Sequence, residues 1–141
     1  MATQSLTDIQ LRTAASVDVP AIAAFIQPFV DAGKILPRTC DELEEHPDNF
    51  FIVEHAGAIV GVAALDVYCQ KLAEVRSLCV AESVRGLGVG RMLVEACVVR
   101  AKTHNILEVM AITCEDDFFK ACGFDYTLTG EKRAVFYQTR E

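Results

Sequence analysis

A glycine-rich loop directly ahead of the one long amphipathic helix is the feature that most constrains this chain. The loop spans Arg85–Arg91 and carries glycine at three of its seven positions. It lies between an apolar strand that ends at Val80 and a helix expected over residues 90–103. Glycine lets the backbone pass close to a ligand with several N–H groups turned inward. The N-terminus of the helix adds partial positive charge. The combination predicts a pyrophosphate-binding loop.

Three other interpretations of this loop were weighed against that prediction. A dinucleotide-binding fingerprint needs a third glycine where Arg91 stands, and it usually opens its domain rather than following a hairpin-rich half. A Walker A loop needs a Gly-Lys-Ser/Thr ending, which this loop lacks. A glycine-rich turn without any ligand is the third alternative.

The periodicity of apolar residues predicts an alternation of strands and helices. Strands are expected over residues 9–13, 50–55, 59–67, 72–80, 108–113 and 134–139, and helices over 16–33, 41–45, 90–103 and 116–122. A hairpin-rich half followed by a strand–helix–strand unit implies a mixed, mostly antiparallel sheet with helices on its faces. The expected fold class is therefore α/β (α+β), in a single domain over residues 1–141.

Local signals add details to two of these helices. Ser16 is expected to cap the first helix, and Pro28 to bend or end it. On the long helix the residues expected to face inward are Val89, Met92, Leu93, Ala96 and Val99.

Charge excludes some classes of partner. Thirteen basic against twenty acidic residues give a formal net charge of -7. Nucleic-acid binding without sequence preference needs a basic field, and so does docking on anionic lipid, so neither partner is expected. An anionic ligand held locally by a helix N-terminus and one or two arginines stays compatible with this charge.

Cysteine usage and the N-terminus indicate the compartment. The polar segment 1–12 has no basic region followed by an apolar run, so no signal peptide is expected. The longest apolar stretch, residues 58–65, is far too short for a membrane span. The six cysteines form no CxxC pair and have no zinc-like spacing with histidine. We therefore expect reduced thiols, a cytoplasmic location and no metal.

Two motifs together resemble the GNAT superfamily of N-acetyltransferases. The run Arg85-x-x-Gly88-x-Gly90, between a strand and a long helix, is similar to the acetyl-CoA loop of that superfamily. The pair Phe118-Phe119, followed by Gly123-Phe124, is similar to its F-Y-x-x-x-G-F run. The element order matches over nearly the whole chain. The resemblance implies acetyl-CoA as cosubstrate and a GNAT-like fold.

Two further segments are similar to the acetyltransferase domain of N-acetylglutamate synthase. Residues 35–39 match its L-P-R-[ST] segment, and residues 73–80 match its E-x-x-[SC]-L-x-V strand. This resemblance implies transfer of an acetyl group to the α-amino group of an amino acid, L-glutamate first, as in arginine biosynthesis. The amino-acid-kinase-like domain of many such enzymes has no counterpart in this sequence, so arginine control of that type is not expected.

The resemblance also assigns residues to the cofactor and to the chemistry. Those expected at acetyl-CoA are Leu78, Cys79, Val80, Arg85, Gly86, Leu87, Gly88, Val89, Gly90 and Arg91. Glu74 is expected as the general base, because a carboxylate among apolar strand residues is costly unless it is used or paired. Backbone N–H groups near Leu78–Val80, freed by a strand bulge, are expected to stabilise the oxyanion.

The proton donor to the leaving thiolate is less well specified. Many members of the superfamily use a tyrosine where this chain has Phe119, so Thr113, a water molecule or unassisted departure are the alternatives. Cys114 and Cys122 allow an acyl-cysteine route in principle, but direct transfer in a ternary complex is simpler.

A pocket for a dicarboxylate needs cations with planar donors. The candidates for substrate binding are Arg38, Arg76, Lys132 and Arg133, with a solvated charge as the alternative for each. Arg76 is also expected to neutralise Glu74. Another small amine as acceptor, and a CoA-binding module without catalysis, stay open as alternatives. The oligomeric state also stays open, with a homodimer among the alternatives.

Overall fold

The structure is a computed structural model, and it describes residues 8–127 and 134–139. Its strands are β1 (Ile9–Thr13), β2 (Phe50–His55), β3 (Ala58–Cys69), β4 (Leu72–Val80) and β5 (Glu108–Met110). Its α-helices are α1 (Val19–Asp31), α2 (Cys40–Glu45), α3 (Val89–Thr103) and α4 (Asp116–Ala121). Short 3-10 turns precede α1, β2 and α3. No described helix is long and apolar enough to cross a bilayer.

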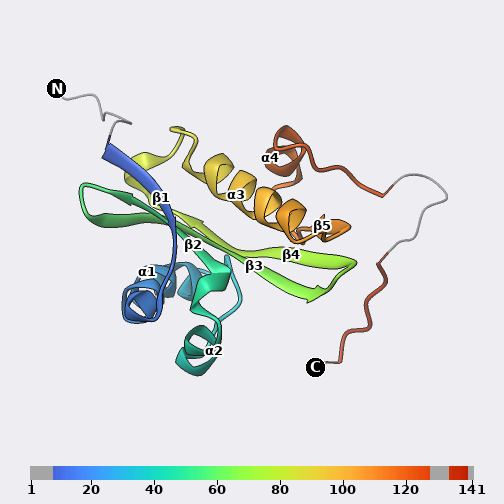
Figure 1. Cartoon of the computed structure of the whole chain (residues 1–141), viewed down its shortest axis with the longest axis horizontal. Coiled ribbons are helices and arrows are strands. Elements are labelled where there is room, and N and C mark those ends of the chain that lie inside the picture. Colours follow the sequence, from blue (N-terminus) through green and yellow to red (C-terminus); the bar gives the residue numbers. More distant parts are fainter. Residues whose placement is uncertain (1–7, 128–133, 140–141) are drawn as a thin grey trace.

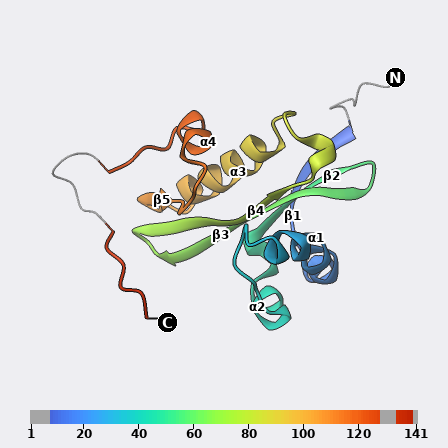
Figure 2. The same ribbon diagram turned by 180° about the vertical axis from the view of Figure 1, so that it is seen from behind.

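The five strands form one mixed sheet in the order β1-β2-β3-β4-β5. Neighbouring strands from β1 to β4 are antiparallel, and β5 alone runs parallel to its neighbour β4. Helices α3 and α4 cover one face of this sheet, and α1 and α2 cover the other (Figures 1 and 2). The predicted fold class is confirmed, and β1, β2 and β4 have the predicted bounds.

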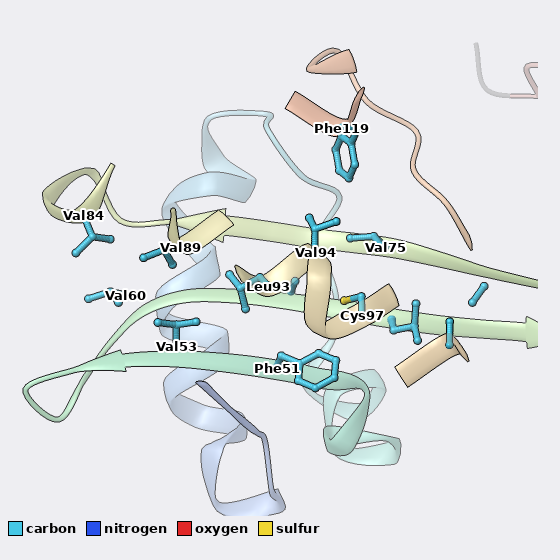
Figure 3. Packing of buried hydrophobic residues seen from close by; sticks show 14 residues of the cluster. Phe51, Val53, Val60, Val75, Val84, Val89, Leu93, Val94, Cys97 and Phe119 are labelled. Atoms are coloured by element: carbon cyan, nitrogen blue, oxygen red, sulfur yellow. The ribbon is translucent and has the colours of Figure 1, made fainter. Parts of the chain in front are cut away.

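The two sheet faces bury separate apolar clusters. The cluster under α3 includes Phe51, Leu65 and Leu93 (Figure 3), and the cluster under α1 includes Ile22 and Phe50. The inward face of α3 is rotated from the predicted one. Its buried residues are Val89, Leu93, Val94, Cys97 and Ala101.

Val99 is 61% exposed, so its predicted inward position is wrong. Residues one turn apart lie on the same helix face, and α3 has apolar residues on more than one face, so periodicity alone does not specify which face packs on the sheet. Val89 and Leu93, both correctly predicted to face inward, lie where α3 comes close to β3. A Cβ atom built on Gly61 of β3 would lie 2.8 Å from Cγ1 of Val89 and 3.0 Å from Cδ1 of Leu93. The missing side chain of Gly61 thus lets α3 lie against the sheet.

Two expectations for the first helix are corrected. Ser16 lies in a 3-10 turn and makes no cap; instead the Asp18 carboxylate accepts from the N–H of Ala15 at 2.8 Å. Pro28 does not end α1, which continues to Asp31. Gly33 follows with a φ of +72°, a left-handed conformation that ends the helical segment.

The strand expected over residues 134–139 is not formed. These residues pair with no described strand, and Val135, Phe136 and Tyr137 are exposed. Their alternation and β-propensity predicted a strand, but a strand also needs a sheet edge to pair with, which local sequence does not specify. Strand β5 ends at Met110, three residues before the predicted end.

Candidate active site

A break in the pairing of β4 creates an open edge in the sheet. Strand β4 pairs with β5 only over Leu72–Glu74. Beyond that point the register with β3 slips, because Ala63 lies opposite both Ser77 and Leu78. Ser77 has a φ of +55°, which is rare for a residue other than glycine and fits a β-bulge. The predicted bulge in this strand is therefore present.

The bulge and the lost partner leave backbone donors of β4 available. The N–H of Ala81 donates to the carbonyl oxygen of Val60 on β3 at 2.8 Å. Successive N–H groups of a strand point to opposite edges, so the N–H of Val80 points to the edge that β5 leaves open. A ligand lying along this edge could accept hydrogen bonds from backbone N–H groups of β4 that pair with no neighbouring strand.

The glycine-rich loop lies at the end of the same strand. Gly86 and Gly88 have φ values of +79° and +85°, and a Cβ atom on either would meet nothing within 4 Å. The loop therefore needs glycine for its backbone conformation and leaves open space in front of it. Gly88 is the N-cap of α3, whose first N–H groups have no acceptor inside the helix.

The side chains expected at the cofactor differ in what they can offer. Arg85 is largely exposed and lies 3.8 Å from Glu82, so its guanidinium can reach a phosphate. Arg91 is paired with Glu95 at 3.0 Å. Cys79 is buried, and burial raises the pKa of its thiol to about 12, so only its backbone can contact a ligand.

Glu74 lies on the sheet face that α1 and α2 cover. It is 8% exposed, and its Oε1 accepts a hydrogen bond from the hydroxyl of Tyr68 at 2.5 Å. Burial, then the bond to Glu74, raises the pKa of Tyr68 to about 12. Tyr68 thus stays a hydrogen-bond donor at neutral pH. Glu74 is a buried carboxylate that accepts one described hydrogen bond, and such a carboxylate can act as a general base.

Two arginines converge on one carboxylate next to Glu74. Oδ2 of Asp66 accepts from Nη2 of Arg38 at 2.9 Å and from Nη1 of Arg76 at 3.0 Å. Nε of Arg38 donates to Oγ of Ser77 at 2.8 Å, which links the loop before α2 to the bulge. Burial is the largest single influence on the pKa of Arg76 and lowers it, but Asp66, Tyr68 and Glu74 together outweigh burial and hold that pKa above its ordinary value.

The predicted pairing of Arg76 with Glu74 is therefore wrong. Residues two apart on a strand share a face, but the carboxylate that meets Arg76 comes from the neighbouring strand. Asp66 lies directly opposite Glu74 in the register, two pairs away from Arg76. This diagonal lies within reach of a long side chain.

The remaining candidates lie after β5, in α4 or outside the described residues. Thr113 follows β5, and its Oγ1 accepts from the N–H of Glu115 at 2.8 Å. Phe119 is buried in the core and packs edge-to-face on Phe118 and Phe124. Lys132 and Arg133 lie outside the described residues.

Sequence reasoning missed Asp66 and Tyr68. Both lie on β3 at alternate positions and share the face of Glu74. The short turn between Cys69 and Leu72 does not reveal this, because regular pairing outward from it would set Val67 against Glu74. A register shift between Val67 and Cys69 places Asp66 there instead.

Comparison with known proteins yields one family and several similar chains. The acetyltransferase (GNAT) family matches residues 15–124. The chain is 34% identical over 117 residues to CT2212 of Chlorobaculum tepidum, described as an uncharacterized N-acetyltransferase, covering 83% of this chain and 76% of that protein. It is 32% identical over 118 residues to an amino-acid acetyltransferase of Neisseria meningitidis, covering 82% of this chain.

A solved structure resembles this fold over most of the chain. The N-acetylglutamate synthase of Neisseria gonorrhoeae, complexed with coenzyme A and N-acetyl-glutamate, superposes with a TM-score of 0.79 at 29% identity. The match covers 93% of this chain and 31% of the synthase. The chain likewise spans 27% of the length of the Neisseria meningitidis enzyme.

Proposed function

Since this chain belongs to the acetyltransferase (GNAT) family and is an acetyl-CoA-dependent N-acetyltransferase, we propose that its acceptor is the α-amino group of L-glutamate. The observation that carries the proposal is the grouping of a buried carboxylate, Glu74, with two guanidinium groups, those of Arg38 and Arg76, on one sheet face. A carboxylate there suits proton removal from an ammonium group. Guanidinium groups suit binding of an acceptor carboxylate.

The open edge of β4 and the glycine-rich loop are the expected binding site of acetyl-CoA. The N–H groups at the start of α3 and the guanidinium of Arg85 would hold the pyrophosphate of acetyl-CoA. The N–H of Val80 would hold the thioester end, because it faces the edge that β5 leaves unpaired. The acetyl group then lies beside the strand that carries Glu74.

The reaction follows as direct transfer between two bound substrates. Glu74 takes a proton from the acceptor ammonium, directly or through one water, and the freed amine attacks the thioester carbon. The N–H groups near the bulge stabilise the negative charge that develops on the carbonyl oxygen. The nitrogen then gives up its second proton to solvent and the carbon–sulfur bond breaks. Thr113 or a water gives a proton to the departing thiolate and is reprotonated from solvent.

The experiment is CoA release by the purified chain with a panel of amino acids. Glutamate, glutamine and lysine differ in the charge of the side-chain end, and aspartate differs from glutamate only in side-chain length. A hydrogen bond between charged groups contributes roughly 1.5–3 kcal/mol, so we expect glutamate to exceed glutamine at least about tenfold in kcat/KM. Equal constants for these two would overturn glutamate as the preferred acceptor and leave acetyl transfer to an amino acid standing.

Arg38→Ala tests the acceptor contact separately. A contact made in both the ground state and the transition state raises KM more than it lowers kcat. We therefore expect the KM for glutamate to rise at least about tenfold, with kcat changed less. Arg12→Ala is the control, because Arg12 lies on β1 and pairs with Asp18 and Glu54 instead.

A further inference from the structure

Asp66 is the carboxylate on which the acceptor-side arginines meet. Its Oδ2 alone accepts from both Arg38 and Arg76, at 2.9 and 3.0 Å. Its side chain is 14% exposed and that of Arg38 is 9% exposed, so the Asp66–Arg38 pair is largely shielded from water. Electrostatic interactions are stronger there than at an open surface.

The charges of the four-residue cluster formed by Arg38, Arg76, Asp66 and Glu74 balance. Arg38 and Arg76 contribute two positive charges, and Asp66 and Glu74 contribute two negative charges. An amino acid that is neutral overall, with one ammonium and one carboxylate, adds no net charge to such a face. An acidic amino acid adds one negative charge, which Asp66 repels.

Asp66 also limits which donors the arginines can offer. Arg38 uses Nε for Ser77 and Nη2 for Asp66, and among the described contacts its Nη1 binds no other residue. Arg76 uses Nη1 for Asp66. A second carboxylate arriving at this cluster therefore competes with Asp66 for guanidinium N–H groups rather than finding both arginines free.

From this geometry we propose that Asp66 is a specificity-determining residue, which sets the preference of the enzyme between acidic acceptors and their uncharged amides. It acts as a positioning residue, through Arg38 and Arg76. The proposal rests on the proposed function only in placing the acceptor at this face. It concerns the change in preference when Asp66 is altered, whichever acceptor the native chain prefers.

The test compares kcat/KM for glutamate and glutamine in the native chain and in Asp66→Asn. Removal of the competing negative charge raises the glutamate-to-glutamine ratio at least about tenfold, mainly through the KM for glutamate. Glu54→Gln is the matched control, because Glu54 is also a partly buried strand carboxylate that accepts from an arginine, at 2.5 Å from Arg12 Nε. Its ratio stays within about twofold of the native value.

A ratio that Asp66→Asn leaves within about twofold of the native value overturns the proposal. So does an equal shift in Glu54→Gln, because the effect would then come from net charge alone. Failure of the proposed function gives a different result, which is no acetylation of any amino acid by the native chain. In that case the same ratio is measured with 4-aminobutyrate and 4-aminobutyramide, which lack an α-carboxylate and differ by one charge.

A second pair of variants covers the loss of folding that one surplus positive charge at this cluster would cause in Asp66→Asn. Arg76→Gln alone removes one positive charge and lowers the acidic-to-amide ratio. Adding Asp66→Asn to Arg76→Gln restores the native charge balance, and it raises the ratio at least about tenfold above Arg76→Gln alone. Equal ratios in Arg76→Gln and the double variant overturn the proposal.

Discussion

The hydroxyl of Tyr68 lies 2.5 Å from Oε1 of Glu74, across the hairpin formed by β3 and β4. The two residues share one sheet face, and Glu74 is buried while Tyr68 is about half exposed. The bond gives the carboxylate a donor where it would otherwise lie among apolar neighbours. It also orients one carboxylate oxygen and leaves the other for a substrate proton.

Substitutions at this pair are expected to affect the chemical step unequally. General-base catalysis contributes on the order of 100- to 10,000-fold, so Glu74→Gln lowers kcat at least about 100-fold at neutral pH. Tyr68→Phe removes only the orienting bond, and lowers kcat by about fivefold to tenfold. Steady-state kinetics, with acetyl-CoA affinity measured by calorimetry, checks both. A loss of only a few-fold in folded Glu74→Gln would show that Glu74 is structural.

Two glycines with similar backbone conformations allow the role of the cofactor loop to be tested against a matched control. Gly88 and Gly57 have φ values of +85° and +81°, and a Cβ atom on either would meet no atom within 4 Å. Alanine at either position therefore carries the same backbone strain of about 1–2 kcal/mol. Only Gly88→Ala places a methyl group where acetyl-CoA is expected. Calorimetry should show at least about tenfold weaker binding in Gly88→Ala. Equal affinities in the two variants would contradict a phosphate contact at this loop.

The contact of α3 with β3 predicts a stability effect with a compensating second site. Gly61→Ala places Cβ 2.8 Å from Cγ1 of Val89, and overpacking of this kind typically costs about 1–3 kcal/mol. Val89→Ala removes that Cγ1 atom. The double variant should therefore lose less stability than the sum of the two single variants, as measured by urea unfolding. Strict additivity would show that Gly61 and Val89 do not limit the approach of α3.

The pair formed by Arg12 and Asp18 predicts how stability depends on pH. Two hydrogen bonds of 2.8 Å from Arg12, with a further one from Ala15, lower the pKa of Asp18 from 3.8 to about 2. The stabilisation is fully present above the unfolded-state pKa, and it is lost as the pH falls from about 4 to about 2. Because Arg12 is partly exposed, we expect a contribution of roughly 1 kcal/mol.

Asp18→Asn should therefore be destabilised at pH 7, and its difference from the native chain should shrink as the pH falls through this range. Thermal unfolding monitored by circular dichroism from pH 7 to pH 2 measures it. Asp31→Asn is the control, since Asp31 is exposed and its described donor is the Gln27 side chain. A difference between Asp18→Asn and the native chain that stays constant with pH would contradict the assignment.

Features encoded by neighbouring residues were predictable from the sequence. The bounds of β1, β2 and β4 follow from apolar alternation ended by turn residues. The cap of α2 is equally local, because Oγ1 of Thr39 accepts from the N–H of Glu42, three residues along the chain. The glycine-rich loop was recognisable for the same reason, since its conformation and the helix behind it depend on consecutive residues.

Tertiary structure decided which charges meet at the candidate site. Arg38 and Asp66 are 28 residues apart, and their contact depends on where the loop before α2 crosses the sheet. The partner of Arg76 was mispredicted because strand register, and not spacing along one strand, brings Asp66 to it. The rotation of α3 likewise depended on how the whole helix packs on the sheet, because Val94, Cys97 and Ala101 are buried and Val99 is exposed. Local backbone preferences act between adjacent residues, whereas side-chain pairing is selected by the packing and register of distant elements.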